Sequence, residues 1–378
     1  MMTQLVEKFK SLYGNEPLLF RSPGRINLIG EHTDYNDGFV LPAAIDKAVY
    51  VAIGMRQDDE IHLYSAEFND RYTTSLQSVQ PVQGWPTYVL GVVDQFQKNG
   101  LSVKGFNMVL DGDVPIGAGL SSSAAVECAT AFALNEIFGF AIERMSLVKM
   151  AQKAEHEFAG VKCGIMDQFA SMFGKKEHVI RLDCRSLEYE YFPLEMDEVK
   201  IVLLDTQVKH SLASSEYNVR RSQCEEGVAA IQQRYPSVKN LRDVTVDMLK
   251  ECVTDGIVYN RCLYVIEENL RLKAACQDLL QHNLKSFGEK MFATHEGLST
   301  LYEVSCKELD FLVGAVKSNS AVLGARMMGG GFGGCTINLV KKDAIDSLIE
   351  DVSVQYEQAM HKKLKAYIVQ IENGTSKM

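Results

Sequence analysis

Residues 115–125 read PIGAGLSSSAA, a glycine-rich turn that follows an expected strand and opens an alanine-rich helix. Glycines before a helix let the backbone approach a ligand closely, and the first amides of the helix have no partners within it. The helix dipole adds positive potential at the same place. The stretch therefore predicts a phosphate site that needs no lysine, and its three serines add hydroxyls for phosphate oxygens or for a Mg2+ ion.

A serine cap after a tight turn is the plainer interpretation of these residues. Two glycines and three serines exceed what capping requires, so we favour the phosphate site. The Gly-x-x-x-x-Gly-Lys-Ser/Thr pattern of the P-loop is absent from the sequence. A nucleotide phosphate bound here therefore requires a different class of fold.

Strands and helices are expected to interleave irregularly, which predicts an α+β fold of mixed α/β layers. In the first part, helices are expected at 87–98, 121–138, 144–158 and 166–173, and strands at 18–21, 47–54, 60–65, 106–110 and 178–183. An apolar run at 199–205 begins a second unit, with helices at 216–234, 259–281, 284–304 and 342–362 and strands at 321–326, 335–340 and 365–370. We therefore expect two domains, residues 1–200 and 201–378.

The two ends of the chain carry weaker patterns. Leu5, Phe9 and Leu12 recur at helical spacing, which predicts an amphipathic helix at the amino terminus. Residues 373–375 match the spacing of a glycosylation acceptor, but in a chain expected to be cytoplasmic we interpret them as part of a frayed tail.

Composition limits the classes of function. The 378 residues are 46% hydrophobic, which is enough for a sizeable core. The net charge of −10 argues against a dedicated surface for nucleic acid or anionic membranes. Nine scattered cysteines without zinc spacing, and the lack of a leader-like pattern, favour a cytoplasmic protein. We expect a monomer, and the sequence allows no protein partner to be inferred.

Residues 24–35, GRINLIGEHTDY, place charged groups among apolar ones behind two glycines. Arg25 offers a fork of donors, Glu31 and Asp34 offer acceptors, and His32 can do either. Such a segment suits a small polyhydroxylated ligand, because each hydroxyl needs a donor and an acceptor at fixed places. A solvated surface turn is the alternative, favoured for each charged residue taken singly.

Residues 324–335, GARMMGGGFGGC, contain five glycines in six positions. Their spacing satisfies Gly-x-Gly-x-x-Gly, but a dinucleotide fold needs a helix directly afterwards and 335–340 is expected to be a strand. A loop that simply joins two strands is one interpretation. The density of glycines favours close approach of the backbone to a ligand.

These three motifs, in this order and spacing, resemble the GHMP small-molecule kinases, and residues 22–38 resemble the members that act on galactose. Further similarity lies in residues 164–170, GIMDQFA, and 214–218, SSEYN, so that it covers nearly the whole chain. One departure is Met328, where the family usually has threonine, and it lies away from the charged chemistry. The resemblance implies the two-domain GHMP-kinase architecture with an active site in the cleft between the domains.

The resemblance also implies the reaction and the residues that perform it. ATP would phosphorylate the anomeric hydroxyl of α-D-galactose, with Asp167 as the base and Arg25 beside it. Sugar binding would use Glu31, His32, Asp34, Gly164 and Tyr217. ATP binding would use Gly117, Gly119, Leu120, Ser121, Ser122, Ser123 and Ala124, and Mg2+ would be held by Ser122 and Glu155.

Several charged residues are left outside this set. His156, Glu157, Lys209, His210, Arg220 and Arg221 are expected to be surface or structural residues. Two other functions stay open: a kinase for N-acetylgalactosamine or another sugar and, less favoured, a sugar sensor without turnover. A dinucleotide oxidoreductase is rejected, because a strand and not a helix is expected after the glycine run. An intact Ser121–Ala125 stretch and the presence of Asp167 argue against the sensor.

Overall fold

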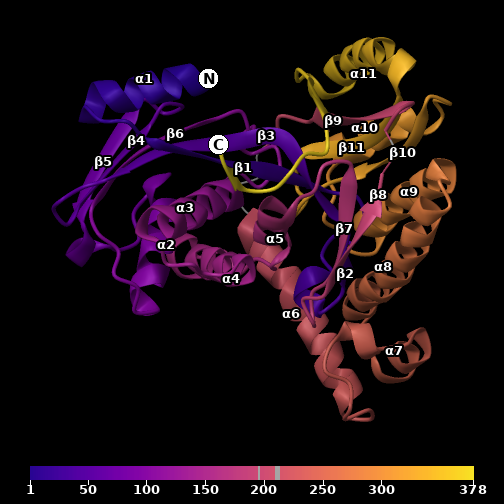
Figure 1. The fold of residues 1–378 in the computed structure, drawn as a ribbon. Helices are drawn as coiled ribbons and strands as arrows, with labels where there is room; N and C mark the ends of the chain where they lie inside the picture. Colours follow the sequence, from indigo (N-terminus) through magenta and orange to yellow (C-terminus); the bar gives the residue numbers. More distant parts are fainter. Residues whose placement is uncertain (195, 209–212) are drawn as a thin grey trace.

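The computed structural model describes residues 1–194, 196–208 and 213–378 (Figure 1). A six-stranded sheet organises the first half of the chain. Its strands run in the order β13 (Ser376–Lys377), β1 (Leu18–Asn27), β3 (Pro42–Met55), β6 (Phe106–Gly112), β4 (Glu60–Ser65) and β5 (Asp70–Ser75). Only β4 and β6 pair in parallel, so the sheet is mixed.

Helices cover both faces of this sheet. The expected amphipathic helix is α1 (Met2–Tyr13), which buries Leu5 and Phe9 against Ala52 and Val109. The other face carries α2 (Pro86–Lys98), α3 (Ser122–Phe138), α4 (Arg144–Ala154) and α5 (Met166–Phe173) (Figure 1). The expected helix at 144–158 changes to a π-helix at Glu155–Ala159, a local widening that often marks a functional position.

Two smaller sheets complete the fold. One has the order β2 (Phe39–Val40), β7 (His178–Asp183) and β8 (Tyr189–Pro193), and the other has the order β10 (Val322–Met327), β11 (Cys335–Lys341), β9 (Val199–Asp205) and β12 (Lys365–Val369). Around them lie α6 (Ala213–Gln232), α7 (Val246–Cys252), α8 (Gly256–Leu280), α9 (Leu284–Thr300), α10 (Lys307–Lys317) and α11 (Ile345–Met360). Short 3-10 turns occur at Asp34–Asn36, Leu76–Ser78, Leu241–Asp243 and Lys342–Ala344. The α+β fold class is confirmed, while β5, β8, α7 and α10 were not expected from the sequence.

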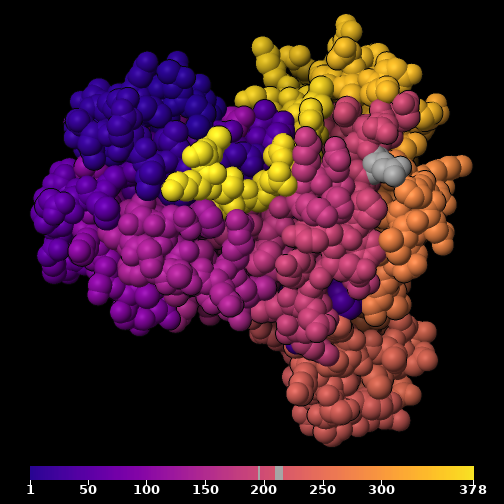
Figure 2. Space-filling model, viewed as in Figure 1, coloured from indigo at the N-terminus to yellow at the C-terminus, as the bar shows by residue number. Residues whose placement is uncertain are grey.

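The carboxyl terminus does not fray. Ile371 bridges Ile45, and β13 pairs with β1 at the edge of the first sheet, so the last residues lie across the first half of the molecule (Figure 2). The Thr375 side chain is 1% exposed and bonds Ser22 and the Ser171 carbonyl. The prediction of a frayed tail at 373–375 was therefore wrong, because buried partners far away in sequence fix it.

One apolar core joins the two halves. It contains Ile29 and Val40 from the first part of the chain together with Leu272 of α8 and Ile337 of β11. The division at residue 200 stays a prediction, since β9 starts there but the chain end returns to the first sheet. No helix of the described residues is both long and apolar enough to span a membrane.

Candidate active site

An arginine fork holds the predicted base. Arg25, near the end of β1, donates from Nε to Oδ1 of Asp167 at 2.8 Å and from Nη2 to Oδ2 at 2.9 Å. Its third nitrogen, Nη1, donates to the Gly119 carbonyl at 2.6 Å. Paired donors of this kind fix both the position and the plane of a carboxylate. The expected neighbourhood of Arg25 and Asp167 is thus present.

The glycine–serine turn approaches the same carboxylate. Ser121 donates from Oγ to Oδ2 of Asp167 at 2.5 Å, and its φ of 58° is unusual for a residue other than glycine. Gly24 permits this approach, because a Cβ there would lie 2.7 Å from the Leu120 carbonyl. Strain concentrated at one serine that reaches Asp167 is typical of a functional turn.

The start of α3 keeps its amides available for an anion. No side chain caps the helix, and Gly117 and Gly119 have positive φ angles that shape the turn before it. Leu120 and Ala124 are buried, so only their backbones could meet a phosphate. The predicted phosphate site is therefore a backbone site at the amino end of α3.

A small polar pocket of about 160 Å³ lies beside Asp167. Thirteen residues line it, among them all five predicted sugar ligands: Glu31, His32, Asp34, Gly164 and Tyr217. Gly164 has to be a glycine, because a Cβ there would lie 1.6 Å from Oδ2 of Asp34. The structure thus brings together residues that are separated by up to 186 positions in the sequence.

Burial and negative charge alter the carboxyl group of Asp34. Desolvation by burial, followed by the nearby charge of Asp167, raises its pKa to about 7. Asp34 therefore binds a proton close to neutral pH and can act as either a donor or an acceptor toward a hydroxyl.

Glu31 is held by a residue that the sequence analysis passed over. Arg326, which is 0% exposed, forms an ion pair with Glu31, with Nη2 2.8 Å from Oε2. The Gly329 amide donates to the same oxygen at 3.1 Å. The glycine-rich motif thereby reaches the pocket, and Gly329 and Gly330 line it. Both contacts are made by Oε2, so among the described residues Oε1 of Glu31 is the oxygen placed to accept from a ligand.

A group of buried carboxylates lies behind Asp167. Ser123 donates to Oε1 of Glu155 at 3.0 Å, and Gln168 donates from Nε2 to both Glu155 and Glu127, at 2.6 and 3.0 Å. Burial, followed by the charge of Asp167, raises the pKa of Glu155. Ser122 does not take part in these bonds and lines the neighbouring cavity instead.

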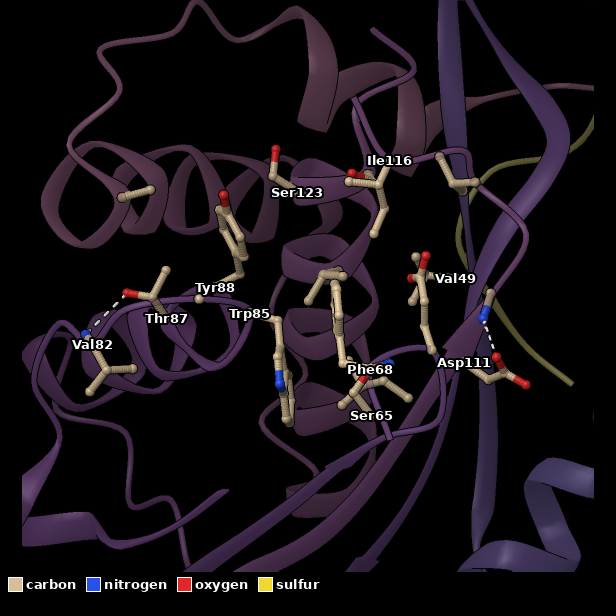
Figure 3. A pocket seen from close by; sticks show the side chains of 18 of the residues that line it. Val49, Ser65, Phe68, Val82, Trp85, Thr87, Tyr88, Asp111, Ile116 and Ser123 are labelled. Carbon is tan, nitrogen blue, oxygen red and sulfur yellow. Dashed lines mark hydrogen bonds between the residues drawn. The ribbon is translucent and has the colours of Figure 1, made fainter. Parts of the chain in front are cut away.

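That neighbouring cavity is apolar, has a volume of about 440 Å³, and was missed from the sequence. Phe68, Trp85 and Tyr88 face it, as Figure 3 shows, and Ser122 and Ser123 connect it to the start of α3. The only signal was the single tryptophan of the chain, just ahead of a proline that starts α2. Aromatic walls of this kind suit a flat heterocycle.

The remaining charged residues mostly have structural partners. Arg220 is buried and donates to the carbonyls of Tyr302 and Glu303, while Glu157 is exposed and pairs with Lys98. His156 contacts the Cys163 carbonyl, and Arg221 pairs with Glu225. Lys209 and His210 lie outside the described residues.

Comparisons with known proteins identify this arrangement. Residues 7–55 match the galactokinase galactose-binding signature, residues 87–175 the GHMP kinases N terminal domain, and residues 273–358 the GHMP kinases C terminal domain. Galactokinase of Thermotoga neapolitana is 43% identical over 95% of this chain and 99% of its own length. Galactokinase of Clostridium acetobutylicum is 40% identical over 100% of this chain and 99% of its own. The chain belongs to the galactokinase family.

Solved structures agree with this galactokinase-family assignment. The galactokinase of Lactococcus lactis, solved in complex with galactose, is 36% identical and covers 100% of both chains with a TM-score of 0.96. The mevalonate kinase of Methanococcus jannaschii, at 18% identity and a TM-score of 0.67, shares the fold alone. The resemblance to GHMP kinases inferred from the three motifs is confirmed, and with it the mixed α+β fold of the family.

Proposed function

We propose that the chain transfers the γ-phosphoryl group of ATP to the anomeric hydroxyl of α-D-galactose, giving galactose 1-phosphate and ADP. The observation that carries the proposal is Asp167, held by the fork of Arg25 in a pocket lined by hydrogen-bonding groups. Membership of the galactokinase family supplies the reaction class.

The proposed chemistry uses few groups. The anomeric oxygen attacks the γ-phosphorus, the bond from that phosphorus to the bridging oxygen of ADP breaks, and Asp167 takes the hydroxyl proton. Arg25 and Ser121 keep Asp167 oriented, and the guanidinium also stabilises negative charge on the transferred group. Such a reaction depends mainly on positioning and on neutralising charge.

Sugar recognition is assigned to the pocket of about 160 Å³. Asp34 and His32 would bind hydroxyls, Oε1 of Glu31 would accept another, and Gly164 would leave room for the sugar backbone. Tyr217 packs its ring at 5.4 Å from that of His32 and would close the pocket. Site-directed loss of Asp34 should therefore weaken galactose binding more than ATP binding, as calorimetry would show.

ATP is placed across the two neighbouring sites. Its base would occupy the apolar cavity between Phe68, Trp85 and Tyr88, and its phosphates would lie at the start of α3. The two glycines, Gly117 and Gly119, and the amides of Ser121, Ser122, Ser123 and Ala124 would form that phosphate site. The cavity borders this turn, and Ser121 of the turn bonds Asp167, so the γ-phosphate would face Asp167.

The site also fits Mg2+. Glu155 is a buried carboxylate with a serine hydroxyl 3.0 Å away, and Mg2+ prefers such hard oxygen ligands. We propose that Glu155 and Ser122 hold the ion, with Ser123 orienting Glu155. An ion held there would supply positive charge against the negative charge of the phosphates. The monomeric state and the cytoplasmic location expected from the sequence stay predictions.

An ADP-release assay over galactose, N-acetylgalactosamine, glucose and other sugars tests the proposal. Galactose should give the highest kcat/KM, and phosphorus NMR should show the phosphate on the anomeric carbon. Asp167→Asn should abolish turnover and keep galactose binding, whereas near-normal turnover would contradict the role of base. A preference for N-acetylgalactosamine would replace the substrate and keep the reaction.

A further inference from the structure

A single loop, residues 28–38 between β1 and β2, carries three of the proposed sugar ligands. Its backbone follows no regular path, since Gly30, His32 and Asp37 have φ angles of 91°, 60° and 56°. Positive φ angles are uncommon at residues other than glycine, and they persist only where surrounding structure imposes them. The loop therefore needs contacts from elsewhere in the chain to hold its ligands in place.

Helix α8, from the second half of the chain, bonds the loop where it enters the pocket. The Gly30 amide donates to Oε1 of Glu268 at 2.8 Å, and the Tyr264 hydroxyl donates to the Glu31 carbonyl at 3.0 Å. A backbone amide can only donate and a carbonyl can only accept, so the direction of both bonds is fixed. Tyr264 and Glu268 are 0% exposed and four positions apart, so they share one face of the helix.

The same helix bonds and packs against the loop where it leaves the pocket. The Phe39 amide donates to Oδ1 of Asn269 at 2.9 Å. Both ends of the loop also lie close to α8, because a Cβ at Gly30 would be 2.6 Å from Leu272 and a Cβ at Gly38 would be 2.6 Å from Asn269. Close packing prevents the loop from moving toward the helix, and the hydrogen bonds prevent it from moving away.

Glu268 is itself held in place by two further residues. The Thr294 hydroxyl, from α9, donates to the carboxylate and lies 3.1 and 3.0 Å from its two oxygens. Arg271 forms an ion pair with Oε2. Burying a carboxylate is unfavourable unless it is paired and hydrogen-bonded. These partners therefore keep a charged acceptor in a fixed orientation, with Oε1 at the Gly30 amide.

We infer that Glu268 is a positioning residue for galactose recognition, because its carboxylate holds the Gly30 amide and thereby the loop that carries the sugar ligands. Tyr264 assists one turn earlier on α8. The identity of the sugar rests on the proposed function, whereas the attachment of the loop to α8 does not. Arg25 and Asp167 lie on β1 and α5, outside the loop. Loss of the attachment should therefore weaken sugar binding and largely spare the chemistry of bound sugar.

The test compares Glu268→Met with Glu268→Gln. Methionine removes the acceptor of the Gly30 amide, whereas glutamine keeps a carbonyl oxygen that can accept the same bond. We expect the KM for galactose to rise about tenfold in Glu268→Met and to stay within about threefold of wild type in Glu268→Gln. In both variants kcat and the KM for ATP should stay within about twofold of wild type.

Hydrogen–deuterium exchange of peptides that cover residues 28–40 gives a second measurement, and it needs no sugar. A bonded and buried amide exchanges slowly, because the structure around it has to open first. Exchange of this segment should therefore be faster in Glu268→Met than in the wild type, and Glu268→Gln should stay close to the wild type.

Glu308→Met is the matched control. Glu308 is also a buried carboxylate, 6% exposed and paired with Lys362 at 3.2 Å, but it lies on α10 and does not line the sugar pocket. This variant should keep the wild-type KM for galactose and the wild-type exchange of residues 28–40.

Tyr264→Phe keeps the test open if Glu268→Met does not fold, because it removes only the hydroxyl that bonds the Glu31 carbonyl. Its KM for galactose should rise about threefold or more, with kcat unchanged. Tyr64→Phe is its control, since Tyr64 is also buried and donates to Asn69 at 2.7 Å, away from the pocket.

Two results would overturn the positioning role of Glu268. One is a wild-type KM for galactose in Glu268→Met. The other is an equal rise in Glu268→Gln and Glu268→Met, since the lost charge and not the lost acceptor would then be the cause. If the wild type does not phosphorylate galactose but residues 28–40 still exchange faster in Glu268→Met, the proposed function fails and the attachment of the loop to α8 stands.

Discussion

Gly164 and the Asp34 carboxylate share a space that no larger side chain can enter. In Gly164→Ala the new Cβ would meet Oδ2 of Asp34 at 1.6 Å, so the carboxylate has to move. A displacement of about 1 Å in a positioned group can cost about 100-fold in rate, and we expect that loss in kcat/KM for galactose. Steady-state kinetics should show it, with ATP binding unchanged by calorimetry.

Gly314→Ala is the control for this substitution, because Gly314 lies within α10 and its added Cβ would meet nothing within 4 Å. It should keep wild-type kinetics. Equal kinetics for Gly164→Ala and the wild type would show that Asp34 does not need its observed position.

The proton bound by Asp34 should also affect how the free energy of unfolding depends on pH. Burial, followed by the charge of Asp167, raises the pKa of Asp34 in the folded protein to about 7 from an ordinary value of 3.8. Between these two pH values the folded state holds a proton that the unfolded state has lost. The stabilisation is full below about pH 4 and is lost as the pH rises through about 7. The free energy of unfolding, measured by urea denaturation, should therefore fall more steeply for the wild type than for Asp34→Asn as the pH rises from 5 to 7.5, because only the wild type loses this contribution. The same pH dependence for both proteins would contradict the raised pKa.

At this scale the sequence predicted the residues that line the pocket better than the buried residues that support them. Arg25, Asp34, Gly164 and Asp167 could be found because a family motif carries each of them. Arg326 could not, since its partner Glu31 lies 295 positions away and no local pattern marks a buried ion pair. A tertiary contact of this kind becomes visible only once the strands are placed.

At the scale of elements, the short strand β13 closes the edge of the first sheet through Thr375. Its hydroxyl donates to the Ser171 carbonyl at 2.9 Å and lies 2.8 Å from the Ser22 hydroxyl. Thr375→Val keeps the shape of the side chain but removes the hydroxyl that bonds the buried Ser22 side chain and the Ser171 carbonyl. The substitution should lower the free energy of unfolding by about 1–3 kcal/mol. Urea denaturation measures this loss, and activity under native conditions should not change.

Thr300→Val is a suitable comparison, because the Thr300 hydroxyl only donates to the Glu296 carbonyl on the exposed side of α9. Its effect should stay within about 0.5 kcal/mol. If both variants lost the same stability, the buried bonds of Thr375 would not be the cause.

Elements with strong periodicity were predicted and those fixed by partners were not. The sequence shows apolar runs at β9 and β11 and apolar residues at helical spacing along α8. These patterns are present because the residues at those positions are buried. The polar residues of β13 and the widened turn at Glu155–Ala159 carry no such repeat. Their conformations depend on groups brought from elsewhere in the chain.

At the scale of the whole molecule, the sugar pocket lies where the two halves meet. It draws Arg25 and Asp167 from the first half and Tyr217 and Gly329 from the second. The apolar core continues through both halves and keeps these groups at fixed positions relative to one another. The motifs implied a cleft only through their resemblance to a family, since no local pattern in the sequence fixes the relative placement of two sheets.

Arg326 is one of the polar links between these halves. From β10 it donates to the carbonyls of Asn27, Leu28 and Met327 and pairs with Glu31, with no exposure to solvent. Arg326→Met would leave the Glu31 charge and the carbonyls of β1 buried without this partner. Breaking a buried pair from one side costs about 3–5 kcal/mol, so urea unfolding should show a loss of that size.

Two further variants test whether the loss of stability comes from breaking the buried Arg326–Glu31 pair or from losing any arginine. In Arg234→Met the lost partner is Glu251 in a solvent-exposed ion pair, so stability should change by at most about 1 kcal/mol. Adding Glu31→Gln to Arg326→Met removes the unpaired charge and should restore part of the loss, although galactose binding would stay impaired because Glu31 lines the pocket. If Arg326→Met were as stable as Arg234→Met, the pair with Glu31 would not hold the halves together, and the apolar core alone would carry that role.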